Sequence, residues 1–159
     1  MARQAVVAVR IIKLGLASLI AVSAAALAQP PTPAGLWKTY SNRTGEADGL
    51  VRVVEVDGEF EGTVQAVFSP PAPSPDPLCE ECSGERRNAP IVGMKILRRL
   101  RWDGEQYSGG EILDPDDGKV YRCSMRLVEG GRKLEVRGFV GIPLFGRTQT
   151  WLRADEIPR

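Results

Sequence analysis

Hydrophobic and polar residues alternate along most of the chain after residue 35, in short runs separated by turn-forming residues. In the run 60–68, Phe60, Val64 and Phe68 share one face, while glutamate, threonine and glutamine occupy the other. Alternation with a period of two is typical of an antiparallel strand that has one buried face and one face in water. The chain beyond residue 35 is therefore expected to be built from strands.

Turn signals divide this pattern into eight strands. Asp57-Gly58, Asp103-Gly104 and the run Pro115–Gly118 combine residues that favour tight turns with flanking β-type segments. The strands are expected at residues 36–40, 50–56, 60–68, 94–100, 106–113, 119–128, 133–140 and 146–153. The inward residues of the last hairpins are expected to be Tyr121, Cys123, Met125 and Leu127, then Leu134, Val136 and Val140.

Eight strands with local connections favour a closed sheet, because an open one would leave two edges free to pair with other chains. Closure into a single antiparallel up-and-down barrel removes both edges. At eight strands the interior is either filled by side chains or holds one small ligand. The fold class expected is all-β, although local hairpins also fit a two-sheet sandwich.

The N-terminal stretch has the layout of a secretory signal peptide. Positive charges at Arg3, Arg10 and Lys13 precede an apolar run at 14–25 and an Ala26-Leu27-Ala28 cleavage pattern. The apolar run of about 12 residues is short for a bilayer, which needs roughly 20. We expect residues 1–28 to be cleaved, with export to the periplasm or medium and no stable membrane span afterwards.

The remainder then divides into a Pro-rich lead-in at 29–34, a barrel domain at 35–153 and a C-terminal tail at 154–159. A long Pro-rich loop at 69–90 interrupts the barrel domain. Loops of this length are often functional.

The composition of the chain argues against several classes of function. The formal net charge is +1, so no basic field indicates nucleic acid as a partner. The chain has no histidine, which excludes His-based catalytic triads and His metal sites. We expect a protein that is not an enzyme and that uses no cofactor or metal.

Three cysteines leave alternatives open. A local disulfide between Cys79 and Cys82 is favoured, with Cys123 as a buried free thiol on its strand. A long-range bridge from either of the first two to Cys123 would pin the Pro-rich loop to the barrel. A zinc site is the third alternative, but only one Cys-x-x-Cys half-site is present. Redox catalysis is disfavoured, because Glu80 and Glu81 oppose thiolate formation.

Several motifs resemble a bacterial exported family, domain of unknown function 2147. They are the segments Gly35–Trp37, Asp48-Gly49, Gly93–Leu97, Gly109–Pro115, Gly118–Tyr121, Val136–Gly141 and Gly146–Arg153. The resemblance runs from about Gly35 to Arg153. It implies an exported protein with a small β-barrel fold, and it implies no known activity or catalytic residues.

The segment Gly35-Leu36-Trp37 also resembles the first strand of lipocalins. In those barrels an arginine near the last strand often packs across the tryptophan, and Arg147 or Arg153 would take that place here. Trp37 and Trp151 are equally explained as core side chains. These four residues are assigned structural roles.

The barrel interior supplies the candidate ligand site. Lys95, Tyr107 and Tyr121 would orient a polar head, while Phe60, Val64 and Leu134 would line the cavity or simply fill it. The function expected is binding of a small apolar or amphipathic ligand in the periplasm. The alternative is an envelope structural or interaction protein, whose barrel is solid and whose Pro-rich loop docks an unidentified protein partner.

Overall fold

Strands make up most of the described chain, and each one pairs with its neighbour in sequence. The computed structural model describes residues 31–68 and 77–154. The strands are β1 (Gly35–Tyr40), β2 (Ala47–Val56), β3 (Glu59–Val67), β4 (Lys95–Trp102), β5 (Tyr107–Asp114), β6 (Lys119–Val128), β7 (Lys133–Phe139) and β8 (Gly146–Ala154). Three single 3-10 turns lie between them, η1 (Gly84–Arg86), η2 (Glu129–Gly131) and η3 (Pro143–Phe145).

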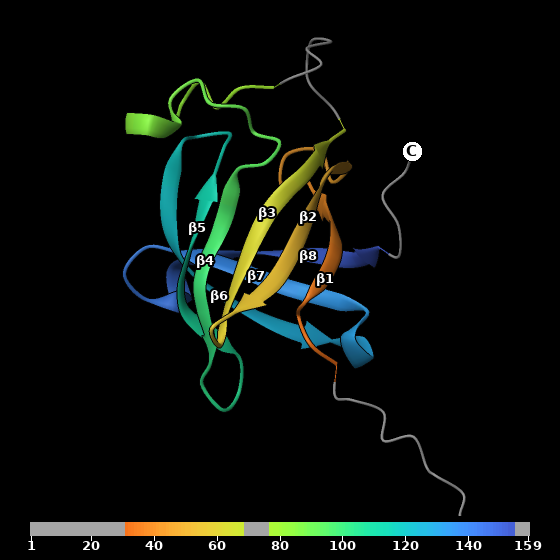
Figure 1. Ribbon diagram of the computed structural model, residues 1–159. Coiled ribbons are helices and arrows are strands. Elements are labelled where there is room, and N and C mark those ends of the chain that lie inside the picture. The colour runs from red at the N-terminus through yellow and green to blue at the C-terminus, as the bar shows by residue number, and fades with distance from the viewer. Residues whose placement is uncertain (1–30, 69–76, 155–159) are drawn as a thin grey trace, which may run out of the picture.

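The eight strands form a closed antiparallel barrel in simple chain order (Figure 1). Closure comes from β1, which pairs with β8 from Leu36 opposite Ala154 to Lys38 opposite Leu152. The predicted up-and-down barrel is confirmed, and the sandwich is excluded because the ladder is continuous around the ring. The predicted signal peptide at 1–28 and the Pro-rich run 69–76 lie outside the described residues.

The register of β4 departs from simple alternation at Arg99. Phe60 of β3 pairs with Leu100, and Gly62 pairs with Leu97, so one more residue of β4 than of β3 lies between the two pairs. Arg99 takes a positive φ of 59°, which marks this β-bulge. Leu97 and Leu100 are thereby both fully buried, although they stand three residues apart.

Two predicted inward residues lie outside their strands. Val140 was expected to face the core with Val136, but β7 ends at Phe139 and Val140 is 70% exposed. The chain turns away here, with Gly141 at a φ of +72°, so the alternation of β7 is lost. Phe68 was likewise expected on the buried face of its strand, yet β3 ends at Val67 and Phe68 is 37% exposed.

The end of the barrel at which β1 begins is closed by a group of contacts around Trp37, which we call the clamp. The indole is 0% exposed, and its Nε1 donates a hydrogen bond to the Pro33 carbonyl at 2.8 Å. The Arg153 guanidinium lies 4.3 Å from the ring centroid. It also donates to the carbonyls of Thr32, Ala34 and Gly131 at 2.7–3.1 Å. Arg153, rather than Arg147, therefore takes the place of the lipocalin arginine.

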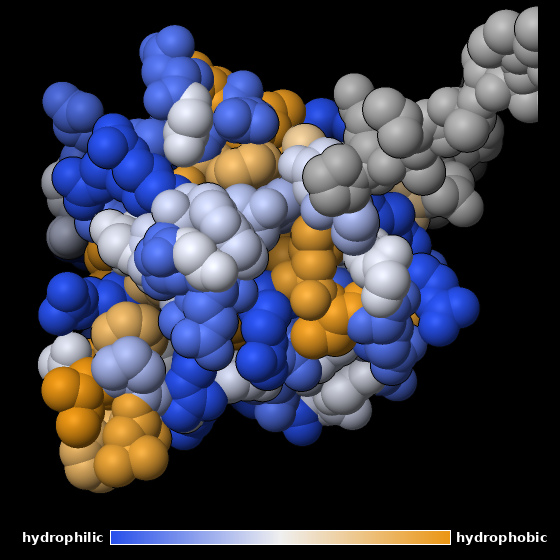
Figure 2. All heavy atoms as spheres, turned by 90° about the horizontal axis from the view of Figure 1, so that it is seen from below, coloured by the Kyte–Doolittle hydropathy of each residue, from blue (hydrophilic) through white to orange (hydrophobic). Residues whose placement is uncertain are grey.

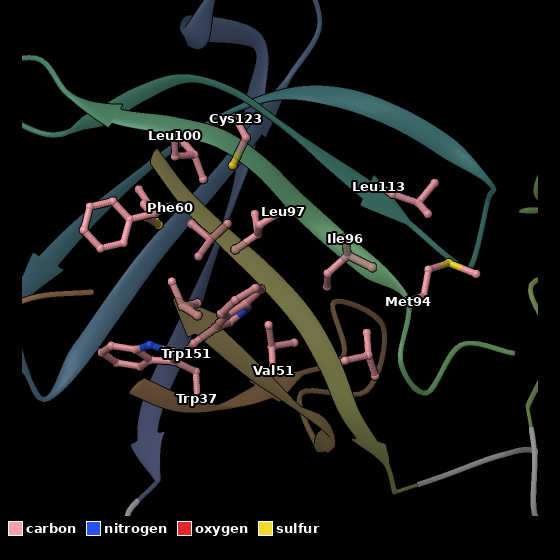
Figure 3. Close-up of a cluster of buried hydrophobic side chains, with 14 of the residues drawn as sticks. Trp37, Val51, Phe60, Met94, Ile96, Leu97, Leu100, Leu113, Cys123 and Trp151 are labelled. Carbon is pink, nitrogen blue, oxygen red and sulfur yellow. The ribbon is translucent and has the colours of Figure 1, made fainter. Parts of the chain in front are cut away.

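Large side chains fill the half of the barrel above this clamp. Figure 3 shows Trp37 beside Trp151, with Phe60, Leu100 and Cys123 farther into the same cluster. The Cys123 thiol is free and buried, and burial raises its pKa to about 12. It is therefore protonated at physiological pH and unreactive.

The cysteines of the long loop are disulfide-bonded, as predicted for the local pair. The Cys79 and Cys82 sulfurs lie 2.02 Å apart and both residues are buried. The bridged segment packs against the turn between β5 and β6, where Gly118 lies directly under Glu81. The long-range bridge to Cys123 is thus wrong, and the local bridge uses both sulfurs that a zinc half-site would need.

Within residues 31–68 and 77–154, no helix is long and apolar enough to cross a bilayer.

Replacing Arg153 by lysine is expected to destabilise the barrel by about 2 kcal/mol or more. Lysine keeps the charge but lacks the planar guanidinium group, which donates hydrogen bonds to three carbonyls and stacks over the indole. Urea unfolding checks the prediction. Arg126→Lys is the control, because the exposed Arg126–Glu135 pair is expected to contribute less than about 1 kcal/mol. Equal effects of the two changes would contradict the clamp.

Replacing Gly118 by alanine tests the packing of the disulfide segment. A Cβ there would lie 1.9 Å from the Glu81 carbonyl oxygen, with φ at +68°. Gly130 is a matched control, since its φ is +67° and a Cβ would meet nothing within 4 Å. Gly130→Ala is expected to cost about 1–2 kcal/mol from backbone strain. Gly118→Ala is expected to cost at least about 2 kcal/mol more, measured by thermal unfolding.

Candidate functional site

The end of the barrel opposite Trp37 is hollow. The connections β1–β2, β3–β4, β5–β6 and β7–β8 surround a cavity of about 880 Å³ that opens between them. Small residues explain the space, because Gly49, Ala66 and Gly138 line this half. The filled half has Phe60 and Met125 in its core instead. The same barrel is therefore packed at one end and open at the other.

The wall of the cavity is apolar. The cavity lining comes from all eight strands, and its apolar members include Val51, Val64, Ile96, Ile112, Val136 and Trp151. The Trp151 indole is held in place by its own hydrogen bond, from Nε1 to Gln149 Oε1 at 2.9 Å. This wall offers contacts to an apolar ligand body but few hydrogen bonds.

The rim of the cavity is polar and mostly acidic. Its charged lining residues are Glu46, Asp48, Asp114, Asp116 and Asp117 against Arg43, Lys119 and Arg147. Thr39 Oγ1 donates to Asp48 Oδ1 at 2.5 Å, and Tyr121 Oη donates to Asp117 Oδ2 at 2.5 Å. The rim can therefore offer both acceptors and donors to the polar head of a ligand.

Burial changes the acidity of the rim groups. It raises the pKa of Asp48, although the Thr39 hydrogen bond opposes this. It also raises the pKa of Asp114, and the neighbouring Asp117, Asp116 and Asp48 carboxylates add to the effect. The hydrogen bond to Asp117, with burial, raises the pKa of Tyr121 to about 12, so its hydroxyl stays a donor.

The structure separates the six predicted ligand residues. Val64 and Tyr121 line the cavity. Phe60 and Tyr107 lie edge to face in the filled half, with ring centroids 4.9 Å apart. The remaining two predicted residues, which stand on β4 and β7, do not line the cavity either.

Leu134 is fully buried in the core cluster and does not line the cavity. Lys95 forms an ion pair with Glu61 and does not line the cavity. Alternation identified inward residues correctly in most strands, but it does not say at which end of the barrel they stand.

The rim residues Asp48, Asp114 and Arg147 were not predicted as ligand residues. Each stands at or near a strand end that leads into a mouth connection. Once the barrel closes, these strand ends meet at one rim, which is the signal that could have indicated them. Within the described residues, no three His, Cys, Asp or Glu side chains are grouped to hold a metal ion.

Replacing Asp114 by asparagine is expected to stabilise the protein at pH 7. The folded state raises the pKa of this carboxyl, so the folded chain binds its proton more tightly than the unfolded chain does. Its charge therefore costs stability at neutral pH, and that cost disappears as the pH falls through the raised pKa and below 3.8. Asparagine keeps the oxygen that accepts from the Asp116 N–H.

Thermal unfolding between pH 7 and pH 3 measures this difference. Asp103→Asn is a control of opposite sign, because hydrogen bonds from Ser108 and the Gln106 and Glu105 N–H groups lower the pKa of Asp103. That variant is expected to be less stable than the parent at pH 7. An Asp114→Asn advantage that is unchanged at pH 3 would contradict the assignment.

A solved structure shares this fold. It is described as "Protein HP1028 from the human pathogen Helicobacter pylori belongs to the lipocalin family". The two chains superpose with a TM-score of 0.68 and 22% sequence identity, over 79% of this chain and 85% of that one. The similarity establishes a lipocalin-like barrel.

No curated protein matches the sequence significantly. The sequence does match a bacterial family, described as "Uncharacterized protein conserved in bacteria", over residues 35–153. That range includes seven strands and all of β8 except its last residue, Ala154, together with the whole rim of the cavity. The chain therefore belongs to the DUF2147 family, as its sequence motifs predict, and it has a lipocalin-like fold.

Proposed function

We propose that this protein is an exported, non-enzymatic binder of a small apolar or amphipathic ligand in the periplasm. The observation that carries the proposal is the cavity of about 880 Å³, with its apolar wall and polar rim. Small-molecule sites are commonly about 300–1,000 Å³, mostly apolar, with a few polar groups that fix orientation. Export is supported by the signal-peptide pattern of residues 1–28.

The chemistry of the cavity sets the orientation of the ligand. An apolar body would lie against Val64, Ile96 and Val136, where it displaces water from the wall. A polar head would stay at the rim beside Tyr121 and Arg147. A purely polar ligand would leave its hydrogen bonds unmet against the wall, so it is disfavoured.

The rival function needs a solid barrel and a Pro-rich segment that docks a partner. The cavity opposes the first requirement, and residues 69–76 lie outside the described residues. Ligand binding is the function that the geometry supports better.

Binding of N-phenyl-1-naphthylamine, an apolar fluorophore, tests the proposal. The protein is expected to give a saturable rise in fluorescence that a long-chain fatty acid displaces. Ala66→Trp places an indole into the cavity and is expected to weaken probe binding about tenfold or more. The protein's own unfolding curve shows whether this variant folds.

Val54→Trp is the matched control. Val54 lies on β2, is 40% exposed and does not line the cavity, so this variant is expected to bind the probe as the parent does. Absence of saturable binding to the folded parent would sink the proposal. Equal loss in both tryptophan variants would place the probe outside the cavity.

A further inference from the structure

The connection between β7 and β8 carries an exposed hydrophobic cluster. Val140, Ile142, Leu144 and Phe145 are 70%, 54%, 75% and 75% exposed. We call these four side chains the apolar tip. Figure 2, seen from below, shows hydrophobic side chains projecting at its left edge, the side on which Figure 1 draws the blue β7–β8 connection. Large contiguous apolar groups in water mark interaction surfaces.

Arginine side chains hold the backbone of this connection. Arg137 Nε donates to the Pro143 carbonyl at 2.8 Å, and its Nη2 donates to the Leu144 carbonyl at 3.4 Å. Arg122 Nη1 donates to the Gly141 carbonyl at 3.3 Å. The apolar tip is thus presented on a braced loop, so little ordering entropy is lost when it is covered.

The charge around the apolar tip is positive. Residues 136–152 include Arg137 and Arg147 and no aspartate or glutamate. Arg122 of β6 adds a further cation against the same loop. The acidic residues of the rim stand on other elements, at residues 46–48 and 114–117. The tip therefore joins hydrophobic side chains to guanidinium groups.

A lipid surface fits this combination better than a protein does. A protein partner of ordinary affinity covers about 800 Å² on each side, which a six-residue projection does not supply by itself. Interfacial membrane binding needs only a few apolar side chains at the headgroup boundary, with cations beside them to meet anionic lipid. Arginine suits the contact with anionic lipid because its planar guanidinium group can donate two hydrogen bonds to one phosphate.

We propose that the apolar tip docks the protein onto an anionic lipid bilayer. The four side chains insert at the boundary of headgroups and acyl chains, and the arginines lie at the level of the phosphates. Val140 and Phe145 also line the cavity, so the docking surface adjoins one side of the cavity mouth. The docking itself does not depend on the proposed ligand.

Vesicle flotation with the purified, disulfide-containing protein tests this inference. One set of vesicles is phosphatidylcholine alone, and the other contains about one third phosphatidylglycerol. The protein is expected to float with the second set, and added NaCl is expected to weaken this binding. Ile142→Ser/Leu144→Ser is expected to lower the partition coefficient about tenfold or more, because two exposed side chains lose their apolar surface. Neither residue lines the cavity.

Val54→Ser/Val56→Ser is the matched control, since both residues are exposed and stand near the opposite end of the barrel. This variant is expected to float as the parent does. All three proteins share one N-terminus, so differences between them report on the loop. Naphthylamine binding, measured in parallel, is expected to be the same in all three and to show that each is folded.

Failure of the parent to float, or equal flotation of the Ile142/Leu144 variant, would overturn the proposal. A loss of self-association in that variant, without a change in flotation, would assign the tip to a second copy of the chain instead. Flotation without naphthylamine binding would sink the ligand proposal and leave the docking surface standing.

Discussion

Closure of the sheet between β1 and β8 is the constraint on which the rest of the molecule depends. Only a few residue pairs join these strands, and the clamp of Trp37 and Arg153 sits at that seam. One guanidinium covers the indole and ties together the chain before β1, the β6–β7 turn and the last strand. Because the clamp closes one end, the cavity is reached from the other, where the mouth connections stand.

Division of the barrel into a packed and a hollow half separates stability from binding. The packed half concentrates the large side chains around Trp37 and Trp151. The hollow half replaces them with glycine, alanine and β-branched residues, and it gives up part of the possible core. The disulfide segment packs outside this half against the β5–β6 turn, so the rim carboxylates Asp114, Asp116 and Asp117 stand on a supported turn.

Most of the fold was predictable because it follows from local signals. Alternation and turn residues predicted all eight strands to within a few residues, and the phase of Cys123 predicted its burial. Departures occurred where the backbone leaves regular geometry, as at the Arg99 bulge and beyond Phe139. The site was harder to predict, because Val64 and Phe60 share a face of β3 and both are buried, and only the closed barrel shows that Val64 borders the cavity and Phe60 does not.

The buried thiol of Cys123 offers a way to follow opening of the barrel. The chain has three cysteines, two are bridged, and the third is buried with a pKa of about 12. A thiol reagent in solution can reach that sulfur only after the barrel opens. The native protein thus contains its own single-site reporter of opening, and its labelling rate would read out how often the sheet comes apart. In an oxidising compartment, the same burial keeps the odd thiol from cross-linking two folded copies.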